Sequence, residues 1–120
     1  MAIGKHDNYK FYEGYEGEEE LVFSTGEDSL HIWDGYIEDI FGDPSSTPIK
    51  QDGLSKDYNE FSGPYADGCV MHPVDVESYL KDARQYEGKT FDYNESKDVL
   101  RAIIKWLEQH KAEQITVRLN

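Results

Sequence analysis

The strongest constraint on the fold is an apolar stripe in the last third of the chain. Between residues 93 and 111, apolar side chains recur every three or four positions, at Val99, Leu100, Ile103, Ile104 and Leu107. This period places them on one face of an α-helix. The alternation of apolar and polar residues over 115–119 predicts a half-buried strand directly afterwards. Both elements need a shared core, in which we expect Leu100, Ile103, Ile104 and Leu107 to be buried.

The ends of this helix carry local signals. Asp92 followed three residues later by Glu95 has the form of a capping box, with Asn94 as an alternative cap. His110 lies near the C-terminal end, where a positive charge interacts favourably with the helix dipole. The sequence therefore predicts where the helix begins and ends as well as which face it buries.

A second helix is predicted over residues 73–87. Pro73 suits the first helical position, where its missing N–H costs nothing, and Gly88 suits the end. One face of this helix is apolar, through Val76, Tyr79, Leu80 and Ala83. The preceding Cys69–Met71 predicts a short buried strand.

The first half of the chain leaves alternatives open. Residues 9–15 and 20–25 predict two strands joined at the turn of glycines and glutamates between them. Residues 29–41 have five apolar positions at helical period, with Asp28 as cap and Gly42 and Pro44 as stop signals. The competing interpretation is a hairpin that turns on Asp34-Gly35; we favour the helix. Residues 42–68 are rich in Pro, Gly, Ser and Asp and predict a long loop region.

These elements predict an α+β fold, with a small antiparallel or mixed sheet packed against two to three helices. A length of 120 residues suits a single domain, residues 1–120, with one core. The one cysteine excludes an internal disulfide, and the first residues lack the apolar run of a signal peptide. We therefore expect a cytoplasmic protein.

No motif in the chain indicates catalysis. The four histidines and the cysteine do not stand at metal-binding spacings, and residues 52–60 lack the alternating ligands and central glycine of a calcium loop. No glycine-rich phosphate loop is present, and 25 acidic residues make pairs of carboxylates uninformative. We expect no catalytic residues, no metal and no cofactor, and hence a protein that is not an enzyme.

Charge is distributed very unevenly along the chain. Residues 1–68 hold sixteen acidic residues against four lysines, a balance of −12, whereas residues 69–120 hold nine against eight, a balance of −1. Solubility alone does not require this asymmetry. A negative field concentrated on one region steers basic partners, and it disfavours direct binding of nucleic acid.

Aromatic and acidic residues alternate in the same half of the chain. Aromatic side chains supply interface anchors and carboxylates supply steering. The alternative interpretation is that the aromatic residues form the core and the acids a solvated face. Three such runs occur, at residues 9–20, 33–39 and 58–67. We predict that the partner-binding residues are Tyr12, Glu13, Tyr15, Glu16, Glu18, Glu19, Glu20, Trp33, Asp34, Tyr36, Glu38 and Asp39.

The runs 12–20 and 33–39, in a short acidic chain that ends in an amphipathic helix and a strand, resemble bacterial immunity proteins. Such proteins neutralise toxins of contact-dependent growth inhibition and other polymorphic toxin systems. The resemblance is one of class and transfers no individual residue. It implies a one-to-one inhibitory complex with a basic toxin domain, often a nuclease, whose active site or substrate path is covered. The alternatives are an acidic adaptor or regulatory domain that binds a basic protein without inhibiting an enzyme, and a small hydrolase with an acidic cleft.

Overall fold

The computed structural model describes residues 6–25, 28–42, 53–61, 69–71 and 76–119. It contains five strands and four helices in these ranges, and the predicted α+β class is confirmed. The strands are β1 (His6–Phe11), β2 (Glu20–Ser24), β3 (Asp28–Trp33), β4 (Cys69–Met71) and β5 (Thr116–Leu119). The helices are α1 (Asp34–Phe41), α2 (Leu54–Phe61), α3 (Val76–Arg84) and α4 (Ser96–Gln109).

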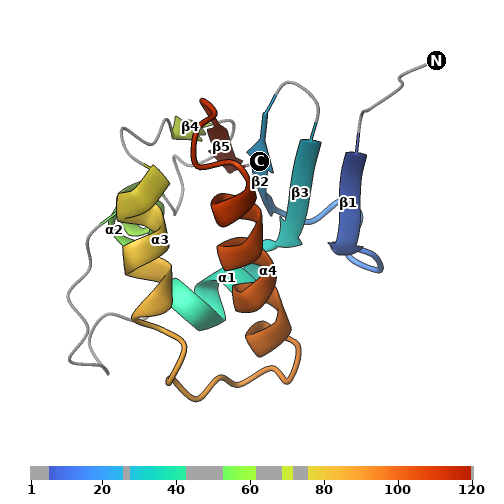
Figure 1. Cartoon of the computed structure of the whole chain (residues 1–120). Coiled ribbons are helices and arrows are strands. Elements are labelled where there is room, and N and C mark those ends of the chain that lie inside the picture. The colour runs from blue at the N-terminus through green and yellow to red at the C-terminus, as the bar shows by residue number, and fades with distance from the viewer. Residues whose placement is uncertain (1–5, 26–27, 43–52, 62–68, 72–75, 120) are drawn as a thin grey trace.

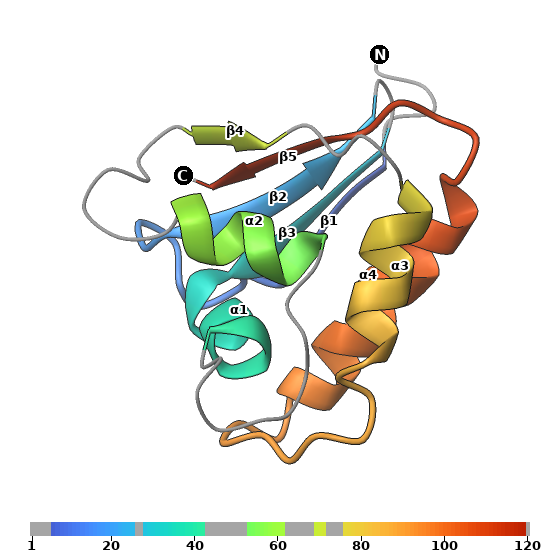
Figure 2. The same cartoon turned by 90° about the vertical axis from the view of Figure 1, so that its left-hand side faces the viewer.

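The strands form one mixed sheet in the order β1-β3-β2-β5-β4. All four helices lie on one side of this sheet (Figures 1 and 2). The pairs β2–β3, β2–β5 and β4–β5 are antiparallel, and β1 pairs with β3 in parallel. Because side chains alternate along a strand, each strand turns every second residue toward the helices. On the central strands these residues are Leu21, Phe23, Leu30, Ile32 and Val117, all fully buried or nearly so.

The longest helix, α4, closes the core from the helical side. Its predicted core residues Leu100, Ile103, Ile104 and Leu107 are all buried, as the apolar stripe indicated. At its end, His110 is buried and ion-paired, when protonated, with Asp28 at 3.1 Å and with Glu113. The histidine thus lies at the helix end, as predicted, and joins that end to the start of β3. Among the described helices, none is long and apolar enough to cross a membrane.

The first half of the chain departs from two predictions. Residues 28–33 are strand β3, and helix α1 begins only at Asp34, so neither the helix over 29–41 nor the hairpin on Asp34-Gly35 is correct as a whole. The hairpin instead joins β2 to β3, where Thr25 N–H donates to Asp28 O at 2.8 Å. The two strands predicted over residues 9–15 and 20–25 are present as β1 and β2, but β1 covers residues 6–11, and β3 lies between the two in the sheet.

Tertiary contacts explain the remaining differences. Residues 54–61 form helix α2 inside the predicted loop region, and its Ser55 N–H donates at 2.6 Å to the buried Asp82 of α3. The predicted capping box does not form: the N-cap residue of α4 is Glu95 rather than Asp92 or Asn94, it makes no side-chain cap hydrogen bond, and the N–H of Asp92 donates to Asp39 instead. Cys69–Met71 is a strand, as predicted, and α3 starts at Val76. The predictions for Pro44 and Pro73 concern residues outside the described ranges.

Candidate functional site

Four aromatic side chains from separate parts of the chain form one cluster, Tyr15, Trp33, Tyr36 and Tyr93. Tyr15 stacks on Trp33 with ring centroids 4.0 Å apart and an interplanar angle of 6°. Tyr36 and Tyr93 meet Trp33 edge-on, at 5.1 and 5.6 Å, and each other at 5.7 Å. Such edge and stacked geometries stabilise aromatic pairs beyond the area they bury. We call this group the aromatic cluster.

The backbone around Trp33 explains why its ring lies there. The ring covers Gly35 so closely that a Cβ at this position would lie 2.3–2.5 Å from three of its atoms. The Trp33 indole N–H donates to Glu18 Oε1 at 3.2 Å. Stacking on Tyr15 and the hydrogen bond to Glu18 therefore hold the ring in place, and the lack of a side chain at Gly35 leaves the space that it occupies.

The segment between β1 and β2 brings its glutamates next to this cluster. Gly14 and Gly17 have φ angles of +90° and +95°, a backbone conformation that glycine adopts without strain. The Tyr12 hydroxyl donates to Glu18 O at 2.6 Å, so Tyr12, which is buried, closes the turn from inside. The turn chemistry of residues 12–18 thus places exposed carboxylates beside Tyr15 and Trp33.

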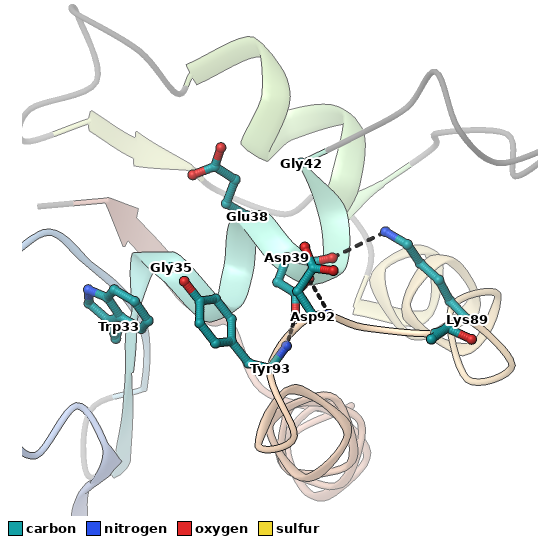
Figure 3. A pocket seen from close by; sticks show the side chains of 9 residues that line it. Trp33, Gly35, Glu38, Asp39, Gly42, Lys89, Asp92 and Tyr93 are labelled. Atoms are coloured by element: carbon teal, nitrogen blue, oxygen red, sulfur yellow. Dashed lines mark hydrogen bonds between the residues drawn. The ribbon is translucent and has the colours of Figure 1, made fainter.

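A groove of about 520 Å³ opens beside the aromatic cluster. One wall is a stripe of α1 and its C-cap, where Gly35, Glu38, Asp39 and Gly42 follow one another at helical spacing. The opposite wall is the segment 89–93. In Figure 3, Trp33 and Lys89 stand at opposite ends of the groove, with Tyr93, Asp39 and Asp92 between them. The groove therefore combines aromatic rings, three carboxylates and one ammonium group.

Asp39 holds the two walls of the groove together. Its Oδ1 accepts the N–H of Asp92 at 3.0 Å, and its Oδ2 accepts the N–H of Tyr93 at 3.0 Å and the hydroxyl of Ser96 at 2.6 Å. A carboxylate that accepts three hydrogen bonds within the protein has little capacity left for a partner. Asp39 thus positions the turn before α4 and, with it, Tyr93.

Lys89 is the cation of the groove, and its ammonium group is also used internally. Its Nζ donates to Asp39 O at 3.2 Å and to Ile40 O at 3.1 Å. These carbonyls belong to the last turn of α1, where a positive charge compensates the helix dipole. The same ammonium lies 5.8 Å from the ring centres of Tyr86 and Phe91. Lys89 therefore stabilises the end of α1. It forms no ion pair with the carboxylates of Glu38, Asp39 or Asp92 that line the groove.

Burial perturbs two groups next to the cluster. Burial raises the pKa of Asp34, and the nearby charges of Glu19 and Glu38 raise it further, against the hydrogen bond that Tyr58 donates to it at 2.7 Å. The pKa of the Tyr36 hydroxyl is also raised, first by burial and then by its hydrogen-bonded neighbour Tyr15. Both shifts favour the uncharged form of the group.

The predicted partner-binding residues fall into two groups. Five carboxylates are exposed and two aromatic rings are half-buried, so these residues are accessible to a partner: Glu13, Glu16, Glu18, Glu19, Glu38, Tyr15 and Trp33. The other five have internal roles that leave little of the side chain for a partner: Tyr12 and Tyr36 are buried, and Glu20, Asp34 and Asp39 have hydrogen-bond partners in the protein. Contact with a partner stays a prediction for both groups.

Sequence reasoning missed the wall of the groove formed by residues 89–93. Tyr93 is 44% exposed, one of the most exposed large hydrophobic side chains of the described chain, and it contacts both Trp33 and Tyr36. A signal was present, because residues 91–95 place Phe91 and Tyr93 among acidic residues, much as residues 33–39 interleave aromatic and acidic side chains. The same residues have the form of a capping box, and from the sequence alone that interpretation is favoured.

The sheet face opposite the helices carries a chain of polar side chains. His31 Nδ1 lies 2.5 Å from Glu20 Oε1, and His31 Nε2 lies 3.0 Å from Ser29 Oγ. This order of carboxylate, imidazole and hydroxyl is also that of a nucleophilic triad. Here, however, the Ser29 hydroxyl donates to Asp7 Oδ1 at 2.6 Å, and Tyr9 stacks on the imidazole at 4.0 Å. These hydrogen-bonded side chains therefore link β1 to β3, and the Ser29 proton points to Asp7 rather than to His31.

Among the described residues, no group of three or more His, Cys, Asp or Glu side chains is arranged to hold a metal ion. Comparison with known proteins adds no assignment: no family model, no curated protein and no solved structure matches this chain significantly. The proposals below therefore depend on the chemistry of the chain itself.

Proposed function

We propose that this protein binds a basic protein domain and neutralises it, in the manner of an immunity protein acting on its toxin, with a nuclease domain as the expected target. The observation that carries the proposal is the meeting of exposed carboxylates with the aromatic cluster on one surface. Within the described residues 6–42, ten acidic side chains stand against a single lysine, Lys10. A surface of this kind attracts a basic partner over a distance and then offers rings for close packing.

A nuclease fits this surface for a physical reason. Domains that act on nucleic acid present lysine and arginine side chains to phosphates. An inhibitor with carboxylates on its surface can occupy the same cationic groups and thereby cover the substrate path. The groups free to do so here include Glu13, Glu16 and Glu19, which are exposed and have no hydrogen bond or ion pair through their side chains among the described residues.

The test is the kinetics of association with a basic toxin domain encoded beside this gene, at two salt concentrations. Reversing Glu13, Glu16 and Glu19 to Lys should slow association at low salt by at least about tenfold and weaken its salt dependence, because steering acts through a field that salt screens. The control for net charge reverses Glu77, Glu87 and Glu108, which are exposed on the α3–α4 side; the change in charge is the same, although Glu77 and Glu108 pair with Lys111 and Arg84, so circular dichroism first checks that this variant is folded. Equal slowing in both variants would show that only net charge matters and would contradict the proposal for this surface.

Inhibition must be measured in parallel with binding. An immunity protein abolishes the nuclease activity of its partner at a one-to-one ratio. An adaptor binds with the same steering and leaves the activity intact. Stoichiometric binding without loss of activity would therefore overturn the inhibitory function and favour the adaptor.

A further inference from the structure

The groove between α1 and residues 89–93 has the size and the lining of a binding site. Its volume of about 520 Å³ falls within the range of roughly 300–1,000 Å³ found for ligand sites. Its shape depends on Asp39, which ties both walls together, and on Gly35, where the Trp33 ring leaves no room for a side chain. The groove is therefore formed by the fold itself before any partner arrives.

The charges in the groove are complementary to a cation. Asp39 already accepts three hydrogen bonds, and Lys89 donates to two backbone carbonyls. The carboxylates of Glu38 and Asp92 are exposed and have no hydrogen-bond or ion-pair partner among the described residues. Both residues line the groove, and two carboxylates without a partner there attract a positively charged group.

The exposed ring of Tyr93 supplies the second contact that such a group needs. It is held edge-on by Trp33 and Tyr36, so little side-chain freedom is lost when a ligand packs on it. Cations are attracted to the face of an aromatic ring, and a guanidinium both stacks on rings and pairs with carboxylates through a planar set of donors. A lysine ammonium lacks the flat surface and the paired donors.

We propose that this groove binds an arginine side chain from an exposed segment of the partner domain, with Glu38 and Asp92 as its ion-pair partners and Tyr93 as its stacking surface. The proposal deepens the proposed function and rests on it for the identity of the partner. The recognition chemistry itself concerns residues of this chain alone, so it can be tested without any toxin.

The probe is a short labelled peptide that alternates glycine and arginine, titrated at low salt, with a lysine peptide of equal length and charge beside it. In NMR spectra of the labelled protein, the arginine peptide should shift the backbone signals of Glu38, Asp92 and Tyr93 more than those of α3. The double variant Glu38→Gln/Asp92→Asn should weaken binding by about tenfold, since two partners of one cation are lost. Tyr93→Leu should weaken binding of the arginine peptide more than that of the lysine peptide.

The matched control is Asp98→Asn/Glu108→Gln, which removes two exposed charges from α4 outside the groove and should weaken binding by less than about twofold. Equal losses in the two double variants, equal affinity for the two peptides, or shifts spread over the whole acidic surface would overturn the proposal. Circular dichroism shows which variants are folded, and the shifts in the unaltered protein test the site in any case. Peptide binding in the groove without toxin inhibition would contradict the proposed function alone; toxin inhibition unaffected by the groove variants would contradict the groove alone.

Discussion

At the scale of single residues, Asp34 is a carboxylate in an unfavourable place. It is half-buried at the start of α1, with the charges of Glu19 and Glu38 near it. The hydrogen bond from Tyr58 lowers the pKa of Asp34, but burial and the two neighbouring charges raise it by more. The pKa therefore remains above its ordinary value of 3.8. The folded protein therefore holds this proton more tightly than the unfolded chain does.

This shift predicts a pH dependence for the variant Asp34→Asn. Between the ordinary pKa of 3.8 and the raised pKa of the folded state, the folded protein binds more protons than the unfolded chain, so the contribution of Asp34 to stability falls with rising pH over this interval and is constant above it. Asparagine keeps an acceptor for Tyr58 and carries no charge, so Asp34→Asn should stabilise the protein at pH 7, by less than about 1 kcal/mol, and lose this advantage near pH 3. Urea unfolding at the two pH values measures this. The control Asp98→Asn, also in the first turn of a helix but exposed, should not stabilise the protein; equal gains in both would contradict the assignment.

The close contact of Trp33 with Gly35 predicts that adding one methyl group, in the variant Gly35→Ala, destabilises the protein. A Cβ at residue 35 would lie 2.3 Å from the Trp33 ring, so Gly35→Ala must displace that ring from the aromatic cluster. The expected loss is about 1–3 kcal/mol, although alanine favours helix more than glycine does. Gly88→Ala is the matched control, because a Cβ there meets nothing within 4 Å, and it should change stability by less than about 0.5 kcal/mol. Thermal melts followed by tryptophan fluorescence compare them, and similar melting temperatures would refute the packing argument.

At the scale of elements, α1 and the N-terminal end of α4 are linked by one side chain. Asp39 accepts hydrogen bonds from Asp92, Tyr93 and Ser96, residues more than fifty positions later in the chain. In place of the capping box predicted at Asp92 and Glu95, the amides of Asp92 and Tyr93, just before α4, donate to a carboxylate of another helix. This link sets the distance between the two walls of the groove.

The link predicts a contrast between two neighbouring carboxylates of α1. Asp39→Ala removes the acceptor of three hydrogen bonds and should cost about 2 kcal/mol or more. Glu38→Ala removes an exposed side chain and should cost less than about 0.5 kcal/mol. Chemical denaturation measures both, and hydrogen exchange of the amides of Asp92 and Tyr93 should accelerate only in Asp39→Ala. Equal costs for the two variants would mean that Asp39 does not carry the link.

At the scale of the whole molecule, the formal net charge of −13 opposes folding. The negative charge is concentrated in the first half of the chain, and the fold brings its exposed part to the surface around residues 13–19 and Glu38. Like charges held close together repel more strongly than in an unfolded chain. The acidic surface therefore reduces stability, which indicates that something other than stability favours it.

Repulsion of this kind predicts that salt stabilises the protein. The screening length falls from about 30 Å at 0.01 M to about 8 Å at 0.15 M salt, so the free energy of unfolding at pH 7 should rise over this range. Reversing Glu13, Glu16 and Glu19 to Lys brings the net charge to −7, since each reversal changes it by two units, and should reduce the gain from salt. Denaturant titrations at the two salt concentrations test both statements, and a stability independent of salt in both proteins would show that the charges are too far apart to interact.

The elements that could be predicted are those whose signals are local. The stripe from Val99 to Leu107 identified α4 and its buried face, and alternation identified β5, because the period of side chains follows from the backbone geometry of one element. Helix α2 was missed although Leu54 and Tyr58 stand at helical spacing, because the acceptor for the amide of Ser55 in its first turn is Asp82, which is distant in the sequence. The boundary between β3 and α1 was missed because an apolar run of this length suits strand and helix alike.

For the candidate site, the amino-acid sequence alone specifies the excess of carboxylates, the presence of aromatic residues among them and the two glycines that allow the turn before β2. Composition and short-range backbone conformation settle these features without a fold. Which carboxylates are free depends on the packing of the elements, because Asp34, Asp39 and Glu20 accept hydrogen bonds from other elements and Glu38 has no such donor among the described residues. The contact of Tyr93 with Trp33 also depends on tertiary packing. The two residues are sixty positions apart in the sequence, and the packing of α1 against α4 brings them together at the groove.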